Sequence, residues 1–125
     1  MNRAIAIPRN TTRQAEGPLL GNVARLLHRA SGAFIVAFVL VHVVVQMIRH
    51  VPLFAPVSAT MPWLVPLQQI AVVHALLYAA VAFHTLHGLR LMAGELGFAV
   101  PYRGAFYGSV VASVAVGLLA FLPHA

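Results

Sequence analysis

The chain has 125 residues, of which 61% are hydrophobic and 8% are charged, and its mean hydropathy is +0.88. A composition this apolar excludes an ordinary soluble domain and indicates a membrane protein. The absence of cysteine excludes disulfides, iron–sulfur ligation and thiol catalysis by this chain. The eight basic residues are all arginines and form no basic stripe, so the net charge of +6 indicates membrane orientation and not nucleic-acid binding.

The first predicted element is an N-terminal segment, residues 1–21, which is polar and carries three arginines. An apolar span at about 31–50 follows, within a helix that begins near Asn22. A proline-rich loop leads to a second span at about 67–90, and a third span covers about 105–122. Each span approaches the roughly 20 residues that a helix needs to cross a bilayer. Backbone groups in lipid must bond within their own segment, so the fold class is all-α, with residues 22–125 forming a three-helix membrane anchor.

Arginines are distributed unevenly about these spans. Five precede the first span and two flank the connection between the second and third, whereas the connection between the first and second holds only Arg49. The positive-inside rule therefore predicts a cytoplasmic N-terminus and a C-terminus on the other side. We expect the protein in the inner membrane, with its C-terminus in the periplasm. The polar ends of the first two spans, residues 27–32 and 84–90, then lie together on the cytoplasmic side.

Histidines within the spans are expensive in hydrocarbon and usually have a function. His28 and His42 are fourteen residues apart, about 21 Å along a helix axis, and project from nearly the same helix face. A neutral imidazole is a good axial ligand for haem iron, but each histidine could instead bond a polar group of a neighbouring helix. At His84, Gly88 one turn later could admit a flat macrocycle or only permit close helix packing.

Two motifs carry a resemblance to a known family. Residues 27–32 read L-H-R-A-S-G, which resembles the HR-x-SG segment of the cytochrome b subunit of succinate dehydrogenase, respiratory complex II. Residues 84–90 are similar to the family's H-x-x-x-G-[IL]-R segment at the cytoplasmic end of its second helix, and Glu95 stands where the family usually has an aspartate. The resemblance covers residues 21–97, and the third span only by hydropathy. It implies that the chain forms half of a haem-binding helical bundle.

The resemblance also implies the site residues. His84 matches the axial ligand of haem b, and Arg29 matches the arginine of the quinone site, which lies near the haem propionates. His28 matches a residue close to those propionates, and Ser31 a polar position in the wall of the quinone pocket. The chain departs from the pattern at Arg25, where some members have a serine that contacts the quinone.

His42 resembles a feature of family members that bind two haems. In those members the first and second spans each supply one iron ligand, and a companion anchor subunit supplies the partner histidines. We therefore expect two haems, with His84 on the inner iron and His42 on the outer iron. His74, at a similar depth to His42, is an alternative ligand or a helix-packing residue, and His87 is expected to make a secondary contact.

The implied function is that of a membrane anchor of a succinate:quinone oxidoreductase, with haem b and either ubiquinone or menaquinone as cofactors. A flavoprotein subunit and an iron–sulfur subunit would oxidise succinate and pass electrons to the membrane, where the quinone accepts two electrons and two protons. Glu95 is a candidate for the proton path. The alternatives are a haem-free structural anchor of the same complex, or a cytochrome b subunit of another membrane oxidoreductase such as fumarate reductase or formate dehydrogenase.

Overall fold

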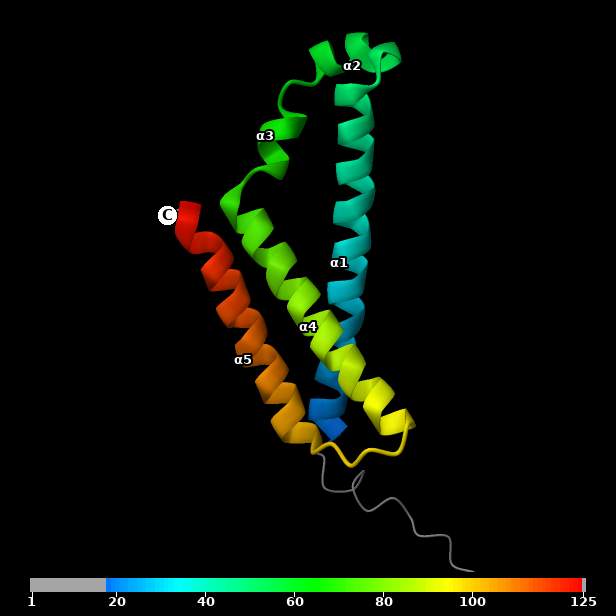
Figure 1. Cartoon of the computed structure of the whole chain (residues 1–125), viewed down its shortest axis with the longest axis vertical. Coiled ribbons are helices and arrows are strands. Elements are labelled where there is room, and N and C mark those ends of the chain that lie inside the picture. Colours follow the sequence, from blue (N-terminus) through cyan, green and yellow to red (C-terminus); the bar gives the residue numbers. More distant parts are fainter. Residues whose placement is uncertain (1–17, 125) are drawn as a thin grey trace, which may run out of the picture.

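The computed structural model describes residues 18–124, and most of the predicted N-terminal segment at 1–21 lies outside the described residues. Three long helices dominate the described part of the chain, and short helical elements connect the first two (Figure 1). Residues 18–124 contain no strand. The elements are α1 (Pro18–His50), η2 (Pro52–Phe54), α2 (Ala55–Thr60), α3 (Leu64–Gln68), α4 (Ala71–Glu95), α5 (Tyr102–Phe121) and η3 (Leu122–His124).

The long helices α1, α4 and α5 are each long and apolar enough to cross a membrane. Most of their large apolar side chains are exposed in the isolated chain, and the buried hydrophobic residues among those described are Ala24, Val45, Phe83 and Phe106. Apolar surface of this extent is covered by lipid or by partner helices in a membrane protein. The predicted all-α class with three membrane-spanning helices is confirmed.

The second membrane helix begins later and ends later than the predicted 67–90. The short helix α3 ends at Gln68, and Ile70 is extended, with φ of −62° and ψ of 123°. The helix α4 then begins at Ala71 and continues to Glu95. Two polar residues, Gln68 and Gln69, stand at this break, but two amides beside an apolar stretch do not by themselves show that the backbone leaves the helix.

A glycine terminates α4. Gly97 has a φ of +87°, a conformation that side chains disfavour. The N–H of Phe98 donates to the carbonyl of Ala93 at 3.0 Å, and the N–H of Gly97 donates to that of Gly94 at 3.2 Å. This pair of bonds is the Schellman motif, which satisfies the last carbonyls of a helix. The position of Gly97 therefore explains why α4 extends beyond the predicted end.

The proline-rich connection between α1 and α4, expected as a loop, folds into short helical turns. Both η2 and α2 have proline in the first two helical positions. Proline is tolerated there because its missing N–H would have had no partner within the helix. The prolines thus start these turns and prevent one continuous helix.

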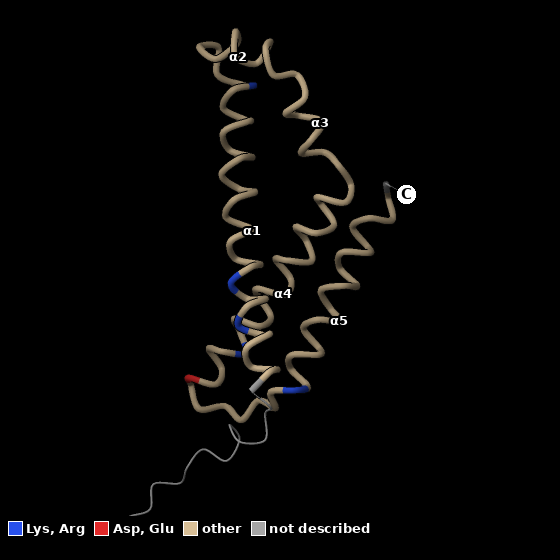
Figure 2. The backbone as a smooth tube through the Cα atoms, turned by 180° about the vertical axis from the view of Figure 1, so that it is seen from behind, with Lys and Arg blue, Asp and Glu red and all other residues tan. Residues whose placement is uncertain are grey.

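The helices α4 and α5 run side by side in opposite directions (Figures 1 and 2). A methyl group at Gly117 of α5 would lie 3.1 Å from the carbonyl oxygen of Ala75, so the glycine permits close approach of the two helices. The buried hydroxyls of Ser109 and Ser113 donate to backbone carbonyls one turn earlier, at 2.7 and 2.5 Å. Beyond Phe106, the buried residues of α5 are therefore small, and their hydroxyls are hydrogen-bonded within the helix.

The helix α1 crosses α4 near the beginning of α1 and diverges from it toward the other end (Figure 1). At the crossing, Ala24 of α1, Phe83 of α4 and Phe106 of α5 form the hydrophobic core. The guanidinium carbon of Arg90 lies 4.0 Å from the centre of the Tyr102 ring, a cation–π contact between α4 and α5 at this end. This hydrophobic cluster therefore lies toward one end of the bundle, whereas Val45 is buried separately near the other end of α1.

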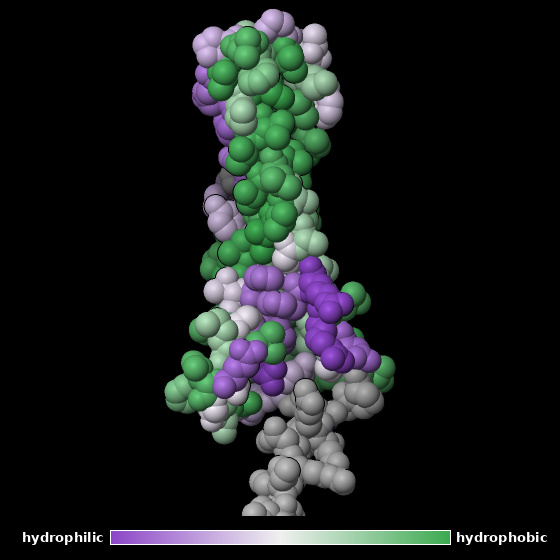
Figure 3. Space-filling view, turned by 90° about the vertical axis from the view of Figure 1, so that its right-hand side faces the viewer, coloured by the Kyte–Doolittle hydropathy of each residue, from purple (hydrophilic) through white to green (hydrophobic). Residues whose placement is uncertain are grey.

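Arginines gather at the end of the bundle that holds the core (Figure 2). These are Arg25 and Arg29 of α1, Arg90 of α4 and Arg103 in the first turn of α5, whereas Arg49 lies in the last turn of α1. Hydrophilic side chains gather toward the same end in the space-filling view, below a mainly hydrophobic column (Figure 3). We call this the arginine-rich end, and its cytoplasmic orientation stays a prediction.

Candidate functional site

Two histidines meet where α1 crosses α4. The rings of His28 and His84 are stacked, with centroids 4.0 Å apart and an interplanar angle of 7°. Each histidine is followed four residues later by a glycine, Gly32 on α1 and Gly88 on α4. A methyl group at Gly32 would lie 2.9 Å from Cε1 of His84, and one at Gly88 would lie 3.6 Å from Cε1 of His28. Each ring therefore packs against the glycine of the opposite helix.

This reciprocal packing bears on whether Gly88 admits a flat macrocycle or permits close helix packing. The ring of His28 lies beside Gly88, so here the glycine permits the packing of α1 on α4. No contact was predicted for Gly32, although a methyl group there would lie closer to the ring of His84 than one at Gly88 would lie to that of His28. The available signal was the second His-x-x-x-Gly spacing, at His28 and Gly32, which matches that of His84 and Gly88.

Two oxygen atoms of α1 contact Nδ1 of His84. The carbonyl oxygen of His28 and Oγ of Ser31 are each 3.2 Å from it. The Ser31 hydroxyl donates to the same carbonyl at 2.9 Å. A carbonyl oxygen can only accept, so its contact with Nδ1 is a hydrogen bond when Nδ1 carries the proton. The free lone pair of the imidazole is then on Nε2, which has no hydrogen-bond partner within residues 18–124.

This arrangement suits metal ligation. Histidines that bind metals usually donate their second ring N–H to a carbonyl or carboxylate, which fixes the tautomer and the orientation of the ring. Among the described residues, no group of three or more His, Cys, Asp or Glu could hold a metal ion by itself. A single imidazole held in this way could add one ligand to a metal that other groups already hold, such as the iron of a haem.

His87 lies behind His28 in the core. Its side chain is 2% exposed, stacks on Phe83 with centroids 5.4 Å apart, and meets Phe106 edge-on. Its ring centroid is 5.4 Å from that of His28. Within the described part of the chain its buried Nδ1 has no hydrogen-bond partner. His87 therefore packs against the ring on which His84 is stacked, and its expected secondary contact with a cofactor stays a prediction.

Arg29 lies on the exposed face of α1 at the arginine-rich end. With Asn22, Arg25 and Leu26 it lines an open pocket of about 330 Å³. Oδ1 of Asn22 accepts a 2.6 Å hydrogen bond from Nη2 of Arg25, which holds one of the two guanidinium groups in place. A forked guanidinium is suited to carbonyl and carboxylate oxygens, so this pocket offers a quinone headgroup or a propionate two cationic partners.

The other two residues predicted for the quinone site, Ser31 and Glu95, do not line this pocket. The hydroxyl of Ser31 contacts His84 and the carbonyl of His28. Glu95 is the exposed last residue of α4. Their participation in a quinone site stays a prediction.

The predicted outer ligand, His42, lies toward the opposite end of α1. Its ring stacks on Phe38 one turn earlier, with centroids 6.0 Å apart, and its Nε2 is 3.5 Å from Nε2 of Gln46. Phe38 also meets the ring of His74 on α4 edge-on, at 6.3 Å. His42 is exposed and His74 is half-buried. The two outer histidines thus flank Phe38, and no ring contact between them exists in the described structure.

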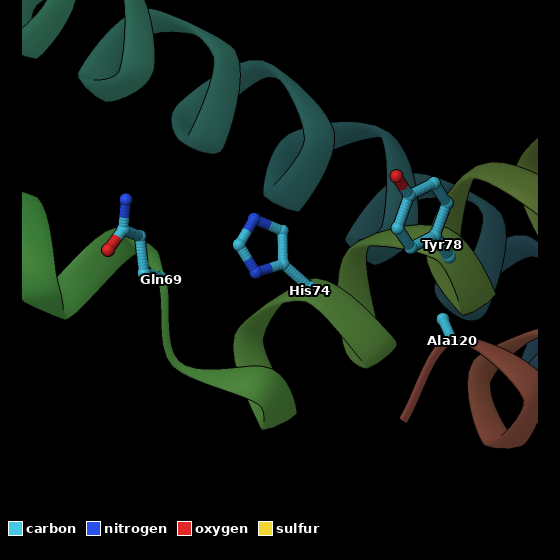
Figure 4. Close-up of a pocket in the computed structure, with 4 residues that line it drawn as sticks. All are labelled: Gln69, His74, Tyr78 and Ala120. Carbon is cyan, nitrogen blue, oxygen red and sulfur yellow. The ribbon is translucent and has the colours of Figure 1, made fainter. Parts of the chain in front are cut away.

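His74 also lines a second open pocket, of about 720 Å³, with Gln69, Tyr78 and Ala120 (Figure 4). In this view Gln69, His74 and Tyr78 project toward the side on which α1 lies. Polar side chains within an apolar span are costly unless they find partners. This region therefore offers polar groups to a further helix or a ligand.

A match to one protein family covers nearly the whole chain. The family described as the succinate dehydrogenase/fumarate reductase transmembrane subunit matches residues 8–122, a range that includes all of α1, α4 and α5. No match was found among curated proteins or solved structures. The family match confirms the resemblance that the motifs at residues 27–32 and 84–90 predicted.

Proposed function

Because the chain belongs to the succinate dehydrogenase/fumarate reductase transmembrane subunit family, we propose that it is the anchor that binds haem b and quinone in a succinate:quinone oxidoreductase. A flavoprotein and an iron–sulfur subunit would carry the dehydrogenase chemistry, and a second anchor subunit would complete the membrane bundle. The observation that carries the haem part of this proposal is the free Nε2 of His84, whose Nδ1 contacts two oxygens of α1.

His84 would hold the iron of the inner haem. When bound, haem b supplies one-electron transfer between donor and acceptor. The chain's own contribution is to fix the ligand: the ring of His84 stacks on His28 and its Nδ1 bonds to oxygen. His42 would hold the iron of an outer haem in the same way, with His74 as the alternative ligand. Each iron would take its second axial histidine from the second anchor subunit.

Arg29 would bind the oxygens of the quinone headgroup or of a haem propionate. Its guanidinium is always charged, and it shares a pocket at the arginine-rich end with Arg25 and Asn22. Reduction of the quinone consumes two protons, which Glu95 would help to supply from the cytoplasm. Four arginines at this end of the described helices support a cytoplasmic orientation for it.

The haem part of the proposal is tested by replacing His84 with alanine in the intact complex. We expect the variant to lose the inner haem, because alanine provides no ligand atom for the iron. The measurement is the haem-to-flavin ratio of the purified complex, together with its reduced-minus-oxidised spectrum. His50→Ala is the matched control, since His50 is an exposed histidine at the end of α1.

Full retention of haem in His84→Ala would reject the ligand assignment. The absence of any b-type band from the unmodified complex would instead support the haem-free structural anchor.

The quinone part is tested by Arg29→Ala. Loss of a hydrogen bond to a charged group costs about 1.5–3 kcal/mol, so kcat/KM for quinone should fall roughly 10- to 100-fold. Succinate oxidation with an artificial electron acceptor should be unaffected, because that reaction does not need the membrane site. Arg103→Ala is the control, since Arg103 is an exposed arginine at the same end that does not line the pocket. Unchanged quinone kinetics in Arg29→Ala would reject the proposed pocket.

A further inference from the structure

We infer that Ser31 is a positioning residue for His84. Together with the carbonyl of His28, its hydroxyl oxygen fixes the imidazole in the tautomer that carries the proton on Nδ1, which leaves Nε2 free for iron. This inference rests on the proposed function, because the free nitrogen matters only if His84 binds a metal. It gives Ser31 a different role from the quinone-pocket wall that the family resemblance implied.

The three polar atoms form a closed triangle at the crossing of α1 and α4. The hydroxyl of Ser31 donates to the carbonyl of His28 at 2.9 Å, so its only hydrogen is directed at that oxygen. The lone pairs of Oγ are then available to Nδ1 of His84, 3.2 Å away. Nδ1 lies at the same distance from the carbonyl oxygen. Both neighbours of Nδ1 are therefore hydrogen-bond acceptors.

The opposite tautomer is disfavoured by the same distances. With the proton on Nε2, the lone pair of Nδ1 would face the carbonyl oxygen of His28 at 3.2 Å, with no hydrogen between them. The Ser31 hydroxyl could donate to Nδ1 only by giving up its bond to that carbonyl. An unmade hydrogen bond in a half-buried apolar setting costs about 1–3 kcal/mol. Two acceptors on one side of the ring therefore select the tautomer with Nε2 free.

Three neighbouring residues of α1 act on the one ring. His28 stacks against it, Ser31 accepts from its Nδ1, and Gly32 leaves room for its Cε1, where a methyl group would come within 2.9 Å. The L-H-R-A-S-G segment thus forms the surface on which the imidazole of His84 rests. Within that surface Ser31 is the residue whose side chain hydrogen-bonds to the ring of His84.

This hydrogen bond should also affect the iron. A bond that draws the Nδ1 proton toward an acceptor makes the ligand more basic and stabilises the oxidised metal. Removing the Ser31 hydroxyl should therefore raise the midpoint potential of the inner haem. The carbonyl of His28 would still accept from Nδ1, so the haem should remain bound.

The test compares Ser31→Ala with Ser31→Thr, which keeps a hydroxyl at the same atom, in the assembled complex. We expect the reduction equilibrium of the inner haem to shift by up to about tenfold in Ser31→Ala, equal to about 59 mV for one electron. The electron paramagnetic resonance signal of the oxidised haem should change with it. Ser31→Thr should remain close to the unmodified complex. Loss of haem from Ser31→Ala but not from Ser31→Thr would support the same role.

Unchanged potential and resonance signal in Ser31→Ala would overturn the inference, and so would an equal shift in Ser31→Thr. Slower quinone reduction in Ser31→Ala with an unchanged haem would overturn it as well, because Ser31 would then belong to the quinone pocket. These outcomes differ from failure of the proposed function, which appears as retention of haem in His84→Ala.

Discussion

The histidines make different contacts in the two halves of the membrane bundle. At the arginine-rich end, the ring of His28 contacts those of His84 and His87, and α1, α4 and α5 share a core. Toward the other end α1 leaves α4, and His42 and His74 meet only through Phe38. Histidine rings therefore pack against one another in one half, whereas in the other half His42 is exposed and the half-buried His74 makes no ring contact with it in the described structure.

This difference indicates how much of each site one chain can provide. The proposed inner ligand, His84, has Nδ1 hydrogen-bonded, its ring stacked on His28 and a glycine, Gly32, beside it, all within this chain. The outer candidate, His42, is exposed, and its recorded polar contact is a long one of 3.5 Å to Gln46. We therefore expect the inner site to depend mainly on this chain and the outer site to depend on the second anchor subunit.

His42→Ala should have the largest effect on the proposed outer site. We expect this variant to lose one of two haems. Alanine removes the outer ligand but changes nothing at the inner site, so the haem-to-flavin ratio should fall from two to one. His74→Ala is the matched variant, because it removes an outer histidine on α4 beside the same Phe38. It should keep both haems. The ratio is measured in the purified complex as for His84→Ala.

Other results of this pair would change the assignment. Loss of the outer haem from His74→Ala, but not from His42→Ala, would transfer the ligand to α4. A ratio of one in the unmodified complex would leave His84 as the only ligand of this chain and return His42 to helix packing.

Much of the fold could be predicted from the sequence, because membrane spans are dictated by length and hydropathy. The three long helices and the gathering of Arg25, Arg29, Arg90 and Arg103 follow from those properties. The break at Ile70 was not predicted, because the polar pair Gln68 and Gln69 beside an apolar stretch does not by itself show that the backbone changes direction.

The sequence indicates which residues lie at the candidate site, but not which of their atoms are in contact. The motifs placed His28, Arg29, Ser31 and His84 at one end of the bundle, and three of these four meet at the crossing of α1 and α4. Which atoms meet depends on the register and crossing of two helices, which the periodicity of each helix alone does not fix. For that reason the contacts of Ser31 and Gly32 with His84 were not foreseen, while the quinone-pocket role that the family resemblance implied for Ser31 stays a prediction.

A smaller effect should separate the two glycines of the inner site. Gly32→Ala and Gly88→Ala add the same methyl group to helix interiors, where alanine is otherwise favoured over glycine by about 1 kcal/mol. At Gly32 the methyl would lie 2.9 Å from Cε1 of His84, so the ring must move; at Gly88 it would lie 3.6 Å from His28, an ordinary contact. We expect Gly32→Ala to alter the resonance signal of the inner haem and to shift its reduction equilibrium by a few-fold, with Gly88→Ala close to the unmodified complex. Equal responses would contradict this packing, because the contact of Gly32 with His84 would then be no tighter than that of Gly88 with His28. A response confined to Gly88→Ala would indicate instead that the haem approaches α4 at Gly88, and that the inner half of the bundle opens there when the cofactor binds.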